Sequence, residues 1–71
     1  MEPKGYRENL ERLNELFPDR VSISVEECAS VLGLNHKTVR ESLKREKNPI
    51  PSVKIGRRRL IPIAKFARWM S

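Results

Sequence analysis

The sequence predicts a small α+β domain in which helices pack around a two- or three-stranded antiparallel sheet. Apolar residues recur at helical spacing in four segments, whereas short alternating runs bounded by glycine or proline indicate strands. The chain has 71 residues, a length at which folding buries only about 60% of the unfolded chain's surface. Because the core must be small, we expect the working surface on the outside of the domain and not in a deep catalytic cavity.

Positive charge is concentrated in the second half of the chain. The net charge is +6 and the isoelectric point is about 10.1. Residues 1–20 carry four Lys/Arg and five Asp/Glu, residues 21–34 carry only two acidic residues, and residues 35–71 carry eleven Lys/Arg and two Asp/Glu. This asymmetry indicates a polyanionic partner, such as nucleic acid or an acidic membrane surface.

Several classes of protein do not fit the sequence. No run of about 18 apolar residues is long enough to span a bilayer, and the first residues lack the apolar stretch of a signal peptide. The single Cys28 and the single His36 form neither an internal disulfide nor a zinc-binding set. We therefore expect a soluble, intracellular protein without a membrane partner, a metal, a cofactor or a catalytic residue.

Residues 1–20 are predicted to contain an amphipathic helix that ends at Pro18. One stripe of this helix is apolar and consists of Tyr6, Leu10, Leu13 and Phe17. The sequence leaves two alternatives for the stripe. It packs on the domain's own core, or it extends the domain and contacts another protein.

A short strand and a second helix are expected next. Residues 21–23 alternate like a strand, and Ser24 with Glu27 has the spacing of a capping box. The helix should begin at Val25 and end at Gly33, since glycine suits the left-handed conformation that terminates helices.

A third helix should follow almost at once, because Asn35 is a good N-cap. Val39 and Leu43 would face the core, and two short helices joined this tightly form a helix-turn-helix. The opposite side carries His36, Lys37, Arg40, Glu41 and Lys44. Such side chains can meet base edges and phosphates in a major groove. The alternative is an ordinary solvated basic face.

A basic hairpin is predicted after this helix. Residues 53–55 and 59–61 resemble strands, and the connection Gly56-Arg57-Arg58 contains a glycine. A hairpin after a helix-turn-helix is a wing, and its arginines would reach phosphates or a narrow minor groove. The alternative is that these arginines only keep an edge strand soluble.

The last segment should close the core as a helix. Its apolar residues at helical spacing are Ile63, Phe66, Ala67 and Met70. Trp69 could stack on a base, but packing is the favoured interpretation in a protein with so small a core. Cys28 is expected to be a small buried apolar residue.

Three motifs in order suggest a known family. The runs S-V-E-E-C-A-S-V-L-G-L-N-H-K-T-V-R, P-S-V-K-I-G-R-R-R-L-I-P and F-A-R-W-M resemble the excisionase family of small winged helix-turn-helix proteins. This family is related to the DNA-binding domains of MerR-type regulators. The resemblance covers residues 21–70, and the N-terminal helix lies outside it. The core positions that it implies are Val25, Ala29, Leu32, Val39, Leu43, Ile61, Phe66 and Trp69.

The chain departs from the family pattern at three positions. Cys28 replaces the usual alanine, Ser42 stands where an apolar residue is common, and Arg59 occupies a wing position that is often aromatic. Arg59 should make the wing more electrostatic. With residues 21–71 taken as the winged helix-turn-helix domain, the predicted DNA-binding residues are Asn35, His36, Lys37, Thr38, Arg40, Glu41 and Lys44 in the helix and Lys54, Arg57, Arg58 and Arg59 in the wing.

The resemblance implies a sequence-specific architectural DNA-binding protein of a prophage or mobile element, nucleoid-associated in a bacterial cytoplasm. Such a protein bends attachment-site DNA and promotes excision by a tyrosine integrase. Its implied partners are double-stranded DNA, the integrase and a second copy bound cooperatively at an adjacent site. One alternative is a small transcriptional regulator with the same fold. The DNA-binding domain of a recombinase is less favoured. No nucleophile–base pair is evident, the chain begins with Met1, and we expect the fold to be complete at its last residue.

Overall fold

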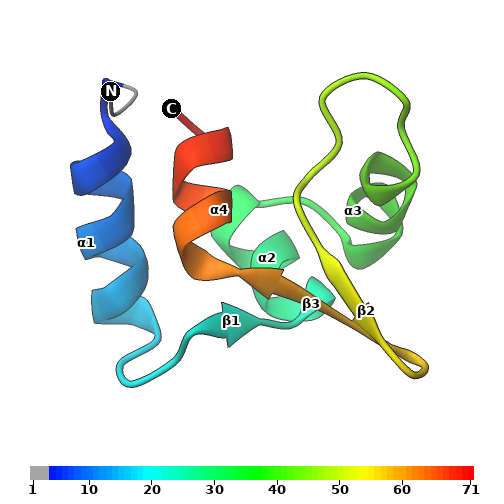
Figure 1. The fold of residues 1–71 in the computed structure, drawn as a ribbon, viewed down its shortest axis with the longest axis horizontal. Helices are drawn as coiled ribbons and strands as arrows, with labels where there is room; N and C mark the ends of the chain where they lie inside the picture. Colours follow the sequence, from blue (N-terminus) through cyan, green and yellow to red (C-terminus); the bar gives the residue numbers. More distant parts are fainter. Residues whose placement is uncertain (1–3) are drawn as a thin grey trace.

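A computed structural model describes residues 4–71, which form four helices and a three-stranded antiparallel sheet (Figure 1). The elements in chain order are α1 (Tyr6–Leu16), β1 (Ser22–Ile23), α2 (Val25–Leu32), α3 (His36–Leu43), β2 (Val53–Ile55), β3 (Arg58–Pro62) and α4 (Ile63–Trp69). Strand β3 is central and pairs with both β1 and β2. The predicted α+β class is confirmed, and this order of elements is compatible with a winged helix.

The core gathers side chains from every helix and from β1 and β3. Its largest fully buried side chains are Phe66, Leu13, Ile23, Ile61, Val39 and Cys28. Ile50, in the loop between α3 and β2, is also buried. The sequence did not indicate Ile50, because an isolated apolar residue between two prolines has no periodicity.

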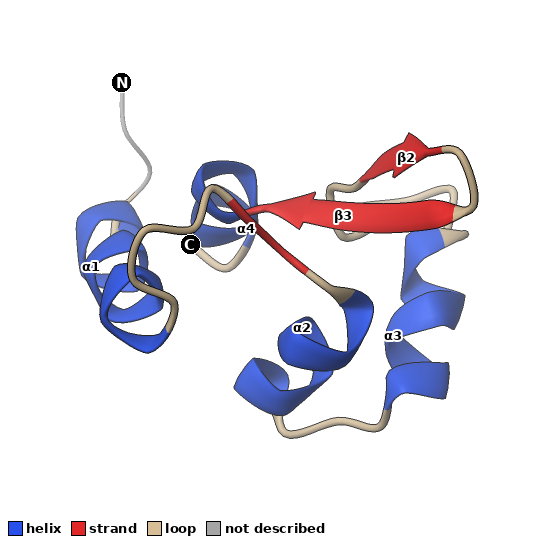
Figure 2. Ribbon diagram, turned by 90° about the horizontal axis from the view of Figure 1, so that it is seen from below, coloured by secondary structure: helices blue, strands red, loops and turns tan. Residues whose placement is uncertain are grey.

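Helix α1 packs on the domain's own core, beside α4 (Figures 1 and 2). Leu13 is fully buried, and the other members of the predicted stripe, Tyr6, Leu10 and Phe17, are partly buried against the core. The side-chain amide Nδ2 of Asn9 donates a hydrogen bond to the carbonyl oxygen of Ala67 over 3.3 Å. α1 is therefore on the opposite side of the molecule from α3 and the tip of the hairpin.

The caps of α2 and α3 form as predicted. The Ser24 hydroxyl accepts a hydrogen bond from the Glu27 amide over 3.1 Å, and the Glu27 carboxylate accepts one from the Ser24 amide over 2.9 Å. Gly33 ends α2 with a φ of 70°. Asn35 Oδ1 accepts a hydrogen bond from the Thr38 amide over 2.9 Å, which sets the start of α3. Residues 35–38, at the start of α3, are exposed.

The hairpin is tighter than the sequence suggested. Ile55 pairs with Arg58, so Gly56 and Arg57 alone form the turn, and Arg58 begins β3 where a connecting residue was expected. Gly56 has a φ of 62°, and a positive φ at the first of two turn residues suits a hairpin turn that matches strand twist. β3 also runs one residue further than expected, to Pro62, because that residue pairs with Ser22.

Strand β1 is shorter than expected, since Val21 lies outside it and is 84% exposed. The Val21 carbonyl oxygen instead accepts a hydrogen bond from the Ile63 amide over 2.9 Å. Trp69 packs as predicted, and the centroid of its ring lies 6.0 Å from the centroid of the Phe66 ring. Its indole N–H donates to the carbonyl oxygen of Asn48 over 3.2 Å, which ties the loop before β2 to α4.

Candidate nucleic-acid interface

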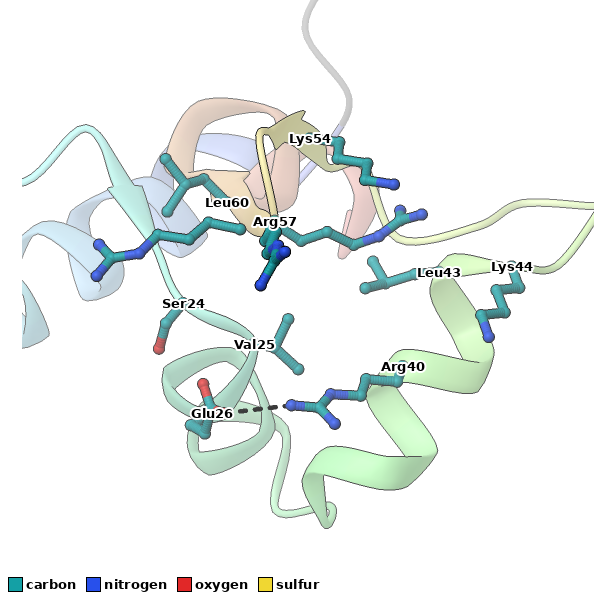
Figure 3. A pocket seen from close by; sticks show the side chains of 11 residues that line it. Ser24, Val25, Glu26, Arg40, Leu43, Lys44, Lys54, Arg57 and Leu60 are labelled. Carbon is teal, nitrogen blue, oxygen red and sulfur yellow. Dashed lines mark ion pairs between the residues drawn. The ribbon is translucent and has the colours of Figure 1, made fainter.

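A groove of about 690 Å³ separates the hairpin of β2 and β3 from helices α2 and α3 (Figure 3). We call it the basic groove. Six of its lining residues are cationic: Arg40, Lys44, Lys54, Arg57, Arg58 and Arg59. One lining residue, Glu26, is acidic. The two segments that the sequence suggested for DNA binding thus contribute cations to one surface.

The groove also has apolar walls. Val25 is buried, Leu43 and Leu60 are half-buried, and all three line the groove. Figure 3 shows Leu43 and Val25 between the cations of α3 and those of the hairpin. Low-dielectric walls next to charge of one sign strengthen the local potential. The groove is therefore suited to attract an anion.

The hairpin holds like charges opposite one another. Lys54 and Arg59 are direct cross-strand partners, and both are exposed. Like charges at such positions destabilise a strand pair. The hydroxyl of Ser52 accepts a hydrogen bond from Arg59 over 3.3 Å, but a hydroxyl carries no compensating negative charge. An anion bound between Lys54 and Arg59 would relieve this repulsion.

The structure divides the predicted helix residues into two groups. Arg40 and Lys44 line the basic groove, whereas the remaining residues are exposed on α3 or at its N-cap and do not line it: Asn35, His36, Lys37, Thr38 and Glu41. Thr38 and Glu41 instead line a second hollow beside Leu34 and Trp69. Asn35 Oδ1 accepts from both the amide and the hydroxyl of Thr38, so its carbonyl oxygen serves the cap.

Glu26 is a groove residue that the sequence did not indicate. It lies in the first turn of α2, and its Oε1 is 3.7 Å from Nη2 of Arg40 on α3. Figure 3 shows Arg40 extending from α3 toward this carboxylate. The pair depends on how α2 and α3 cross, so neither helix's own periodicity could have revealed it.

A second ion pair holds the start of α2. The Arg20 guanidinium donates two hydrogen bonds to the Glu27 carboxylate, over 2.7 and 3.1 Å. These bonds, together with that from the Ser24 amide, hold the pKa of Glu27 below its ordinary value. The charged form of Glu27 is thus favoured, which supports the capping box at one wall of the groove.

Within residues 4–71, no group of three or more His, Cys, Asp or Glu side chains is placed to hold a metal ion. In the same part of the chain, none of the helices has the length and apolarity needed to cross a membrane. Burial raises the pKa of Cys28 to about 11, so this side chain is a thiol at neutral pH.

Comparison of the chain with protein-family models, with curated proteins and with solved structures found no match in any of the three. The charge and shape of the groove are therefore the observations from which a function can be proposed.

Proposed function

We propose that this protein binds double-stranded DNA sequence-specifically through a winged helix-turn-helix, in which α2 and α3 form the helix-turn-helix and the hairpin of β2 and β3 is the wing. The observation that carries the proposal is the basic groove, where six cations and one carboxylate line the space between α3 and the hairpin. DNA presents a phosphate charge about every 1.7 Å along its axis, and six cations on one surface can neutralise several of them.

Helix α3 is suited to the major groove by size. An α-helix with its side chains is about 10–12 Å across, which matches the major groove of B-DNA, about 12 Å wide, and the eight residues of α3 make about two turns that can lie in it. Recognition helices contact base edges with residues near their N-terminus, and here those residues include His36, Lys37 and Thr38, all exposed. Lys and Arg side chains can bind guanine or phosphate from the same helix.

The hairpin would contact the DNA next to α3. Arg57 lies in the two-residue turn at its tip, and Arg58 and Arg59 begin β3. Arginines on a protruding hairpin can bind phosphates or enter a narrow minor groove, where the negative potential is enhanced.

We further propose the excisionase role that the sequence resemblance implies. A single module of this kind buries only about 600–1,000 Å² of protein surface on DNA, and bending a short site costs about 1–6 kcal/mol. Cooperative binding of several copies, or contact with a tyrosine integrase, would offset that cost. A transcriptional regulator would use the same contacts at a promoter. It would not need to bend the DNA, so it would need neither cooperative binding nor an integrase.

Gel-shift titrations on circularly permuted fragments from the gene's own neighbourhood test this proposal, with random DNA at the same salt as the reference. Cooperative binding with a bend at an attachment site supports the excisionase role, whereas specific binding at a promoter without a cooperative bend supports the regulator. The matched variants are Arg57→Ala, in the groove, and Arg12→Ala, on α1. We expect only the first to weaken binding, and equal affinity of both variants and the wild type would contradict the placement of the interface.

A further inference from the structure

Glu26 is the exception in a groove whose other charged side chains are cations. A carboxylate at this position repels the phosphates that the surrounding Lys and Arg would attract, so it lowers the affinity of the surface for DNA of any sequence. The capping box of α2 is made by Ser24 and Glu27 and does not use Glu26. Its place in the first turn of α2 gives Glu26 a favourable interaction with the helix dipole, but Glu27 already supplies a negative charge to the same turn.

The partner of Glu26 is Arg40, the groove arginine that α3 contributes. Oε1 of Glu26 lies 3.7 Å from Nη2 of Arg40, and the two side chains are 65% and 60% exposed. Exposed ion pairs of this kind contribute little to folding stability. The contact therefore contributes more to the orientation of the Arg40 side chain than to the packing of α2 on α3.

We infer that Glu26 is a positioning residue that determines the specificity of Arg40, favouring a base edge over a phosphate as its ligand. This inference rests on the proposed DNA-binding function. A guanidinium has five N–H donors in a planar fork, so Nη2 can face Glu26 while other donors remain free. Guanine O6 and N7 are uncharged acceptors that Arg binds in bidentate fashion, and they can join Arg40 without displacing Glu26.

A phosphate behaves differently from guanine at this position. It carries a full negative charge, so it must either displace Glu26 from Arg40 or lie beside a like charge. Both outcomes weaken the contact between Arg40 and the DNA backbone. Glu26 thus reduces binding to DNA of arbitrary sequence while leaving the contact with guanine in place, and the ratio of specific to non-specific affinity rises.

The first experiment compares Glu26→Gln with Glu15→Gln, which removes the same charge from an exposed position on α1. Affinity for a mixed-sequence duplex is measured between 0.05 and 0.3 M salt. Freeing Arg40 for one more phosphate should steepen the salt slope by about 0.9 and tighten binding about eightfold at 0.1 M salt. Glu15→Gln should change affinity less than about twofold, because surface charges beyond a Debye length are screened. Thermal melts of both variants check that folding is intact.

The second experiment repeats Glu26→Gln in an Arg40→Gln background. If Glu26 acts through Arg40, the tightening seen in the single variant should fall below about twofold, since non-additivity reports coupling between the two sites. A purely structural or long-range role of Glu26 would leave the tightening unchanged, and that result would overturn the inference.

Selection from a randomised duplex library gives the specificity readout. The wild type should enrich guanine at one position, and that preference should weaken in both Glu26→Gln and Arg40→Gln. If the wild type binds DNA but Glu26→Gln shows the same affinity, salt slope and base preference, the inference is wrong while the proposed function stands. If the wild type binds neither the mixed-sequence duplex nor any library member, the proposed function itself is wrong.

Discussion

Replacing Leu13 by alanine tests whether α1 belongs to the folded core. Leu13 is fully buried, and removal of a buried leucine side chain costs about 2–5 kcal/mol through lost burial and the cavity left behind. At roughly 0.05–0.15 kcal/mol per residue, a chain of 71 residues has only about 4–11 kcal/mol of total stability. We therefore expect Leu13→Ala to remove about 3 kcal/mol from the free energy of unfolding. For a domain of this size, the melting temperature should fall by about 12–24 °C.

Leu16 provides the matched control on the same helix, because it is 55% exposed. Leu16→Ala should change the free energy of unfolding by less than about 0.5 kcal/mol, as surface substitutions commonly do. Urea titrations followed by Trp69 fluorescence measure both variants, since this ring packs against Phe66 and reports on the core. Equal and small losses for the two variants would refute the reasoning and would place α1 outside the cooperative fold.

Three further predictions concern charge and the buried thiol. Arg58→Ala should weaken DNA binding about eightfold at 0.1 M salt and reduce the salt slope by about 0.9, whereas Arg12→Ala should change neither; equal effects in gel-shift titrations would exclude Arg58 from the phosphate contacts. Because the pKa of Glu27 is lowered on folding, the stability that it contributes is present above the ordinary glutamate pKa of 4.5 and is lost as pH falls through the lower folded value. Glu27→Gln keeps an oxygen acceptor for the cap, but its free energy of unfolding, measured in urea titrations, should fall less steeply with decreasing pH than that of the wild type. The same pH profile for both proteins would contradict this prediction. Cys28, buried with a pKa of about 11, should react with a thiol reagent at pH 8 only through unfolding, so reaction in the folded protein at the rate of a free thiol would show that it is accessible.

The local features of the fold were predictable because short-range chemistry sets them. The capping box of Ser24 and Glu27, the N-cap Asn35 and the left-handed Gly33 each depend on residues within four positions of one another. The apolar stripe around Leu13 identified a helix, but its partner α4 begins 47 positions after α1 ends. Periodicity alone therefore could not decide whether the stripe would pack internally.

The features that sequence reasoning missed depend on tertiary geometry. Ile50 is buried because the loop before β2 folds back over the core, with Asn48 bonded to Trp69. The pairing of Glu26 with Arg40 requires α2 and α3 to cross at a particular angle. The basic residues of the helix and of the hairpin were visible in the sequence, but which of them share one groove was not.

The salt dependence of DNA binding tests the central proposal most directly. With Arg40 held by Glu26, five cations of the basic groove remain for phosphates: Lys44, Lys54, Arg57, Arg58 and Arg59. At about 0.9 per phosphate contact, log K should fall against log salt with a slope of about −4 or steeper on a mixed-sequence duplex. A slope flatter than about −2, or no binding at 0.05 M salt, would contradict the assignment of this groove as a DNA interface.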